Sequence, residues 1–321
     1  MKSYLITANR KMTETESHPD ETTGIKVRIA ACLPTVSDYN VFTGKVSTQF
    51  PYKPCAPAIG LVSRDYPEYS LKIGDKVIIN PYSINENGNV AVEGNLCDFA
   101  ILPPDKVVPY PQASVTDDEA IFCDYLSIAL KTVSQMNIKK GEYVAILGGS
   151  VIANITAQLV KYFQGIPIYI TGDVAHINVA EKCGIRNIIN EREEEVLTSV
   201  ANVSGGRLAD KTLLFCDINT TPHRLLSLLK DNGNAYIVAT TQELFPLETD
   251  ISLIAKKNVK ITGIMLGAND FEPALNFLVQ KVVDLSNFID CEYTLTSAPV
   301  LFDEIAKSPD LLVCPIIRND W

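Results

Sequence analysis

The segment from Glu142 to Gln158 constrains the fold of this chain more than any other. An apolar run with β-branched residues, 143–147, ends at two glycines and a serine, and residues 151–163 then place apolar side chains at helical spacing. A strand, a tight turn and a helix N-terminus in this order present free backbone N–H groups and the positive helix end to an anion. The sequence therefore predicts a phosphate-binding turn in an α/β domain.

The turn is a variant of the dinucleotide motif Gly-x-Gly-x-x-Gly. Gly148 and Gly149 begin it, but Ser150 stands at the second glycine position and an alanine at the third. The second glycine lets the backbone approach a pyrophosphate, and the third lets the helix pack closely on the strand. A second apolar run, 166–171, is followed by Asp173, near the place of the acid that contacts a ribose. We expect a dinucleotide at this turn; the alternative is an ordinary strand–turn–helix corner.

Composition limits the classes of protein and of partner. The chain has 321 residues, enough for two domains, and 46% of them are hydrophobic. No apolar run approaches the roughly 20 residues of a membrane span, and the N-terminal segment turns polar too soon for a secretory signal. A net charge of −10 disfavours nucleic acid. The eight cysteines form no Cys-x-x-Cys pair, so we expect free thiols in a cytoplasmic protein without a nucleic-acid or membrane partner.

The order of apolar patterns indicates two domains. The N-terminal region is rich in Pro, Gly and Asn and has short alternating runs that are typical of strands. From Asp117 onwards a long helical pattern is followed by strands that alternate with helices, as in a doubly wound parallel sheet. We expect a dinucleotide-binding domain at 127–284, inserted into a β-rich domain made of 1–126 and 285–321. The expected strands of the inserted domain are 143–147, 166–171, 185–189, 213–218, 234–239 and 259–264.

Six different short motifs follow one another along nearly the whole chain. They are the segments 37–44, 71–77, 97–109, 118–130, 140–148 and 180–184. In this order they resemble the medium-chain dehydrogenase/reductase superfamily, which includes alcohol and polyol dehydrogenases and quinone reductases. The resemblance implies a Rossmann-like domain inserted into a GroES-like substrate domain, a nicotinamide cofactor, and a homodimer that forms through the edge strand 260–267.

The resemblance does not extend to the zinc ligands. Zinc-dependent members have a cysteine where this chain has Thr35, and a His-Glu pair at the positions of Ala56 and Pro57. Their third ligand, Cys or Glu, corresponds to Asp124, and one carboxylate does not replace three good ligands. Cysteines next to these positions do not restore the set, because adjacent residues on a strand or helix point in different directions. We therefore expect no metal.

Catalytic candidates follow from the same resemblance. Ser37 stands at the hydroxyl that relays the alcohol proton in zinc-dependent members, and Asn40 stands where many of them have a histidine. Thr35, Tyr39 and Asp124 are the other candidates. Tyr39 is either a proton donor or a packed aromatic residue. Asp124 either binds a substrate hydroxyl and acts as a base, or caps the helix that follows it.

The loop after the second strand bears on the choice of cofactor. Thr171 stands at the family's usual acidic position, with Asp173 just after it, and the loop 171–175 contains no Arg or Lys. A ribose 2′-phosphate requires a cation, so NAD is favoured over NADP. Asn219 replaces a family glycine after the fourth strand. The expected cofactor contacts are Gly148, Gly149, Ser150, Val151, Ile152, Thr171, Asp173 and Asn219.

These features predict a zinc-independent, NAD(P)-dependent oxidoreductase. Its substrate would be a small polar alcohol or ketone, polyol- or sugar-like, or an activated alkene. Without a Lewis acid, hydrogen-bond donors have to polarise a carbonyl while the nicotinamide transfers hydride. The alternative is a catalytically silent dehydrogenase-like binding or scaffold protein. The absence of the zinc ligands and of the central glycine is consistent with this alternative.

Overall fold

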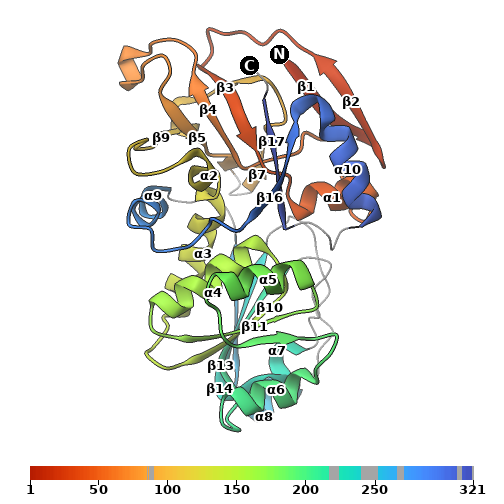
Figure 1. Ribbon diagram of the computed structural model, residues 1–321, viewed down its shortest axis with the longest axis vertical. Coiled ribbons are helices and arrows are strands. Elements are labelled where there is room, and N and C mark those ends of the chain that lie inside the picture. The colour runs from red at the N-terminus through yellow and green to blue at the C-terminus, as the bar shows by residue number, and fades with distance from the viewer. Residues whose placement is uncertain are drawn as a thin grey trace. The chain divides into compact units, whose positions relative to one another are not determined.

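The chain folds into two compact units, seen in a computed structural model (Figure 1). The first unit comprises Met1–Asp124, Gly267–Lys281 and Phe288–Trp321, and the second comprises Tyr125–Leu266 and Val282–Asn287. The structure describes residues 1–84, 86, 90–216, 224–239, 252–265, 271–308 and 313–319. No helix in these ranges is both long and apolar enough to cross a membrane.

One stretch departs from the domain boundaries expected from the sequence. The described residues 271–281, which were expected in the dinucleotide-binding domain, belong to the first unit. Helix α9 (Phe271–Val279) packs against the short helix α2 (Asp117–Ala120). Just after α9, Nζ of Lys281 lies 2.5 Å from Oε2 of Glu119. These contacts hold the stretch to the first unit.

The second unit is built on a six-stranded parallel sheet with β10 (Tyr143–Leu147) near its centre. The strand order is β12-β11-β10-β13-β14-β15, which numbered along the chain is the 3-2-1-4-5-6 order of a dinucleotide-binding domain. Residues 144–147 of β10 are buried, as expected for a parallel strand covered on both faces. The doubly wound sheet predicted from the sequence is therefore confirmed. The other strands are β11 (Ile166–Thr171), β12 (Ile188–Asn190), β13 (Ala209–Cys216), β14 (Leu229–Ala239) and β15 (Lys260–Met265).

Helices cover both faces of this sheet. Right-handed crossovers place α4 (Val151–Tyr162) and α5 (Val174–Lys182) on one face, because both connections run in the same direction across the sheet. The connections that run in the other direction place α6, α7 and α8 on the opposite face. Figure 1 shows these two groups, and α4 packs on α5 just as α7 packs on α8. The remaining bounds are α6 (Val196–Val203), α7 (Arg224–Ser227) and α8 (Ser252–Lys257).

The first unit is rich in β-structure and contains a seven-stranded sheet with two separate hairpins. In β3 (Ile25–Cys32), Ile25, Val27 and Ile29 are fully buried and alternate with more exposed residues, which confirms the strand expected there. The sheet consists of β16 (Ile289–Thr294), β17 (Cys314–Arg318), β3, β4 (Ala58–Val62), β5 (Lys76–Ile79) and β9 (Val107–Pro109), with β8 (Phe99–Leu102) paired to β3; the hairpins are β1 (Lys2–Ala8) with β2 (Lys11–Glu16), and β6 (Tyr82–Ile84) with β7 (Val90–Val92).

Two helices close the core of the first unit. They are α1 (Val36–Thr43) and α10 (Ala298–Lys307), which pack against one another. The ring of Phe302, on α10, lies 5.4 Å from that of Phe42, on α1, in an edge-to-face arrangement that aromatic pairs favour. This packing fixes the position of α1, which carries most of the catalytic candidates.

Candidate functional site

The turn after β10 requires glycine at both of its first positions. Gly148 has a φ of 108°, a conformation that residues with a side chain rarely adopt. A Cβ atom at Gly149 would lie 2.4 Å from Oγ1 of Thr171 and 3.2 Å from Cβ of Asp173. The structure thus brings the glycine turn and the loop after β11 into direct contact, as expected of a single site.

Ser150 begins helix α4 in place of the missing glycine. Its backbone is extended, and its Oγ accepts the N–H of Ala153 at 3.2 Å, so it is the N-cap residue. The N–H groups of Val151 and Ile152 come before the first intrahelical hydrogen bonds and face the helix end. The first turn contains no acidic residue. This end of α4 therefore fits the pyrophosphate of a dinucleotide, and serine is compatible with that role.

Asp173, the acidic residue after β11, caps the helix that follows it. Oδ1 of Asp173 accepts the N–H groups of Ala175 at 3.0 Å and of His176 at 3.3 Å, which makes Asp173 the N-cap of α5. Thr171 is buried, and its Oγ1 accepts the N–H of Asp173 at 3.1 Å. Both residues expected near the ribose thus shape the loop by local hydrogen bonds. Asn219, the remaining residue expected to contact the cofactor, lies outside the described residues.

In the first unit, Thr35 and Asp38 form a reciprocal cap at the start of α1. The Thr35 hydroxyl donates to Oδ2 of Asp38 at 2.9 Å and accepts the N–H of Asp38 at 3.2 Å. Asp38 is buried and also accepts hydrogen bonds from Tyr52 and from the N–H of Cys55. Burial raises the pKa of Asp38, although these donors favour its charged form. The Thr35 hydroxyl, a catalytic candidate from the sequence, is thus engaged in holding the helix.

The other candidates on α1 differ in their surroundings. The Tyr39 ring lies 5.3 Å from that of Phe302 at an angle of 57°, and it packs against the core of the unit. This contact favours the packed aromatic residue over the proton donor. Asn40 is buried, and its backbone carbonyl oxygen accepts the N–H of Lys45 at 2.9 Å at the end of the helix. Ser37 is half-buried in the first turn of α1.

Asp124 lies at the start of α3 (Cys123–Met136) and is only 4% exposed. Its Oδ2 accepts the hydroxyl of Tyr82, on β6, at 3.1 Å. Tyr82 could not be found from the sequence, because no motif marks it and 42 positions separate it from Asp124. The thiol of Cys123 is directed instead to the carbonyl oxygen of Phe271 at 3.9 Å. Asp124 and Tyr82 thus form a buried acid–hydroxyl pair.

Comparison with known proteins finds dehydrogenases that are similar in sequence and in fold. No protein-family model matches it. It is 24% identical over 286 residues to the sorbitol dehydrogenase of Bacillus subtilis, covering 81% of this chain and 80% of that protein. It is 21% identical over 257 residues to a zinc-type alcohol dehydrogenase-like protein of Haemophilus influenzae, covering 75% and 74%. A zinc-binding dehydrogenase structure from Sinorhizobium meliloti, bound to NADP, matches with a TM-score of 0.86 at 18% identity, covering 99% of this chain and 98% of that one. The chain thus has the fold of this dehydrogenase structure and is similar in sequence to sorbitol and zinc-type alcohol dehydrogenases.

The residues that the resemblance aligns with zinc ligands either have other contacts or lack ligand atoms in their side chains. Thr35 is engaged in the cap of α1, Ala56 and Pro57 have no ligand atoms in their side chains, and Asp124 is paired with Tyr82. Among the described residues, no three His, Cys, Asp or Glu side chains come together in a way that could hold a metal ion. Burial, with the nearby Asp124 carboxylate, raises the pKa of Cys123, which keeps that thiol neutral.

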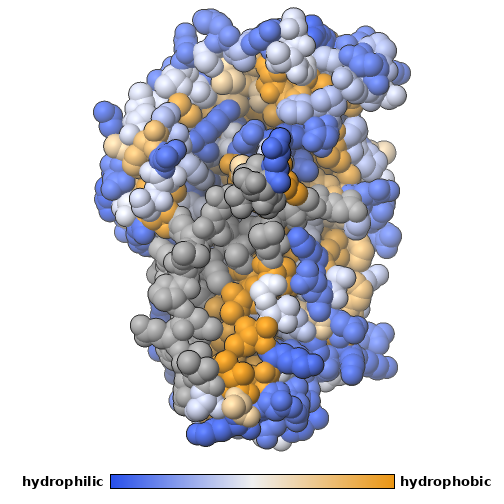
Figure 2. Space-filling view, turned by 180° about the vertical axis from the view of Figure 1, so that it is seen from behind, coloured by the Kyte–Doolittle hydropathy of each residue, from blue (hydrophilic) through white to orange (hydrophobic). Residues whose placement is uncertain are grey.

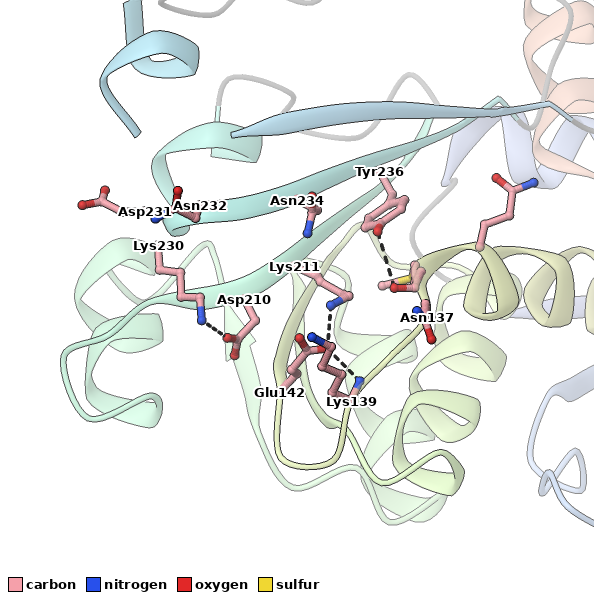
Figure 3. Close-up of a pocket in the computed structure, with 12 residues that line it drawn as sticks. Asn137, Lys139, Glu142, Asp210, Lys211, Lys230, Asp231, Asn232, Asn234 and Tyr236 are labelled. Carbon is pink, nitrogen blue, oxygen red and sulfur yellow. Dashed lines mark hydrogen bonds and ion pairs between the residues drawn. The ribbon is translucent and has the colours of Figure 1, made fainter. Parts of the chain in front are cut away.

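A second polar feature of this dehydrogenase-like chain lies at the other end of the parallel sheet (Figure 3). A cavity of about 530 Å³ lies at the amino ends of β10 and β13 and beside the first residues of β14. Figure 3 shows Lys211 directed to Glu142, at 2.5 Å, and Lys230 directed to Asp210. Ligands of such sheets bind at the carboxyl ends of the strands. These charges also neutralise one another, so we assign the cavity a structural role.

Proposed function

We propose that this protein is an NAD(P)-dependent oxidoreductase that acts on a small polar alcohol or ketone and needs no catalytic zinc. The observation that carries the proposal is the turn at Gly148 and Gly149, whose conformation and close contact with Thr171 exclude side chains. The N–H groups at the start of α4, which precede its first intrahelical hydrogen bonds, are the donors that a pyrophosphate requires. When bound there, the nicotinamide supplies or accepts the hydride.

We further propose that Asp124 is the residue that handles the substrate proton. Its carboxylate would accept a hydrogen bond from a substrate hydroxyl and take the proton of that hydroxyl during oxidation. The Tyr82 hydroxyl, which donates to Oδ2, holds the carboxylate in one orientation. Asp124 is nearly fully buried, so few water molecules compete for it.

The polyol class of substrate is favoured by two observations. A buried carboxylate paired with a hydroxyl suits a substrate that offers several hydroxyl groups, because each one can donate or accept. One relative of this chain is named a sorbitol dehydrogenase. We therefore propose sorbitol-like polyols and the corresponding ketones as the first substrates to test.

The decisive experiment combines metal analysis with cofactor binding. Purified protein would be examined by inductively coupled plasma mass spectrometry and titrated with NADH and NADPH, with fluorescence as the readout. Turnover of sorbitol and 2,3-butanediol would be measured with and without a chelator. We expect cofactor binding and turnover, both unaffected by the chelator, and less than stoichiometric metal. Stoichiometric zinc and loss of turnover with the chelator would contradict zinc independence. No response to millimolar cofactor would contradict the enzyme and favour the scaffold alternative.

Replacing Gly149 tests the carrying observation. Gly149→Val is expected to weaken NADH and NADPH binding by at least about tenfold, because the new side chain must displace Thr171 or Asp173. The matched control is Gly263→Ala on β15, where a Cβ atom meets nothing within 4 Å. Equal cofactor affinity of Gly149→Val and the unaltered protein would show that the turn does not hold the nucleotide.

We also propose that two copies of this chain pair through β15. This strand is an edge of the parallel sheet, residues 260–263 are exposed, and Ile261 is 38% exposed. Figure 2 shows apolar surface on the second unit, seen from behind. Exposed strand edges pair readily with another chain.

Light scattering after size exclusion is expected to show a dimer, and Ile261→Lys is expected to weaken the association of the two copies by about tenfold or more. Ile73→Lys, at an exposed residue of the first unit, is the control; a monomeric unaltered protein would contradict the proposal.

A further inference from the structure

The loop that follows β12 places an arginine directly over the end of β11. A Cβ atom at Gly172 would lie 2.7 Å from Cγ, 2.8 Å from Nε and 3.1 Å from Cδ of Arg192. The side chain of Arg192 therefore lies across the glycine, in space that any other residue at position 172 would occupy. Arg192 lies 20 positions after Gly172, outside the loop 171–175 that contains no cation, so no local motif indicates this contact.

Strand register brings this arginine to the edge of the sheet where the glycine turn lies. Leu147, the residue before the turn, is paired with Ile170, and Thr171 is paired with Asn190. Because all three strands are parallel, their carboxyl ends meet at one edge. The N–H of Glu191 donates to the carbonyl oxygen of Thr171 at 3.2 Å, which continues the pairing to the residue before Arg192.

Local hydrogen bonds and ion pairs fix the surroundings of Arg192. Its own N–H donates to Oδ1 of Asn190 at 3.1 Å, so the backbone turns sharply after β12. The neighbouring Glu191 pairs with Arg224 at 2.9 Å between Oε2 and Nη1. Oδ1 of Asp173, the acid expected near the ribose, accepts hydrogen bonds from two N-terminal N–H groups of α5. The acid of this loop is thus engaged by a helix, while a cation lies over the glycine.

We propose that Arg192 binds the 2′-phosphate of NADP and that this protein prefers NADP to NAD. The inference rests on the proposed nicotinamide function and deepens it by choosing the cofactor. In sheets of this order the adenosine ribose lies at the end of the second strand, which here is β11. A planar guanidinium offers paired donors that match phosphate oxygens, and a second ionisation near pH 6 gives such a phosphate nearly two negative charges.

The test is direct binding, measured by isothermal titration with NADP, NAD, 2′,5′-ADP and 5′-AMP. We expect NADP and 2′,5′-ADP to bind more tightly than NAD and 5′-AMP. Arg192→Ala is expected to lower the affinity for the two 2′-phosphorylated ligands by about 10- to 100-fold, the range for a hydrogen bond to a charged group. Affinity for NAD and 5′-AMP should stay within about twofold, because neither carries the phosphate.

Two further variants separate the arginine from general effects. Gly172→Ala is expected to displace Arg192 and so to lower NADP affinity while the charge remains. Arg186→Ala removes an exposed arginine before β12, at the other end of that strand. It is expected to change neither the affinity for NADP nor the affinity for NAD. Thermal melting of each variant shows that it is folded. Equal discrimination between NADP and NAD in the unaltered protein and in Arg192→Ala, or tight binding of NAD alone, would overturn this proposal. Failure to bind any of the four ligands would overturn the proposed function itself.

Discussion

Asp124→Asn is expected to lower kcat/KM for polyol oxidation by about 100- to 10,000-fold, the usual contribution of a positioned general base. The amide keeps the size of the side chain, and its oxygen still accepts the Tyr82 hydroxyl. It cannot take a proton, however, so only the chemical role is removed. The measurement is steady-state oxidation of sorbitol or 2,3-butanediol with saturating cofactor, alongside a thermal melt of each protein.

Two comparison variants distinguish catalysis from helix capping at this position. Tyr82→Phe removes the orienting hydrogen bond and is expected to cost about tenfold in kcat/KM. Asp118→Asn changes an exposed carboxylate on α2, which pairs with Arg318, and should leave activity unchanged. If Asp124→Asn retained full activity but melted at a clearly lower temperature, Asp124 would be a cap of α3 and not a base.

Lys211→Ala is expected to lower the free energy of unfolding by about 3–5 kcal/mol, the usual cost of removing one partner of a buried ion pair. The side chain of Lys211 is 5% exposed and that of Glu142 is 19% exposed, with 2.5 Å between Nζ and Oε2. Alanine would leave the Glu142 carboxylate without its cation in a poorly hydrated place. Urea denaturation monitored by circular dichroism measures the loss.

The same cavity offers the control for this prediction. Lys230 pairs with Asp210, but its side chain is 42% exposed, so Lys230→Ala is expected to cost less than about 1 kcal/mol. Combining Lys211→Met with Glu142→Gln removes both charges and is expected to recover most of the lost stability. A loss of similar size for Lys211→Ala and Lys230→Ala would show that burial does not set the strength of these pairs.

The parallel sheet could be predicted from the sequence because its strands are buried on both faces. Runs such as 143–147 and 166–171 are mostly apolar, and the structure has strands with these same bounds. The hairpin of β1 and β2 gave no comparable signal, since β2 is mostly polar and at most half-buried. Helix α1 was missed as well: it is short, and a reciprocal cap between Thr35 and Asp38 defines its start.

The candidate site was only partly predictable, for a related reason. The glycine turn is local, so its sequence alone indicates its conformation. The pair of Tyr82 with Asp124 and the contact of Arg192 with Gly172 join residues that are far apart in the chain. Only strand pairing and helix packing bring such residues together, and no spacing rule reveals them. The cap formed by Asp173 could not be told from a ribose contact, because both favour the same type of residue at the same place.

The serine that begins α4 has a consequence for the protein before any nucleotide arrives. In a turn with glycine at that position, no side chain satisfies the first amides of the helix. Here the Ser150 hydroxyl already does so for Ala153. The start of this helix is therefore capped by the chain itself, and forming this cap requires no ligand. An exchange of oxidised for reduced coenzyme would leave this capping hydrogen bond in place.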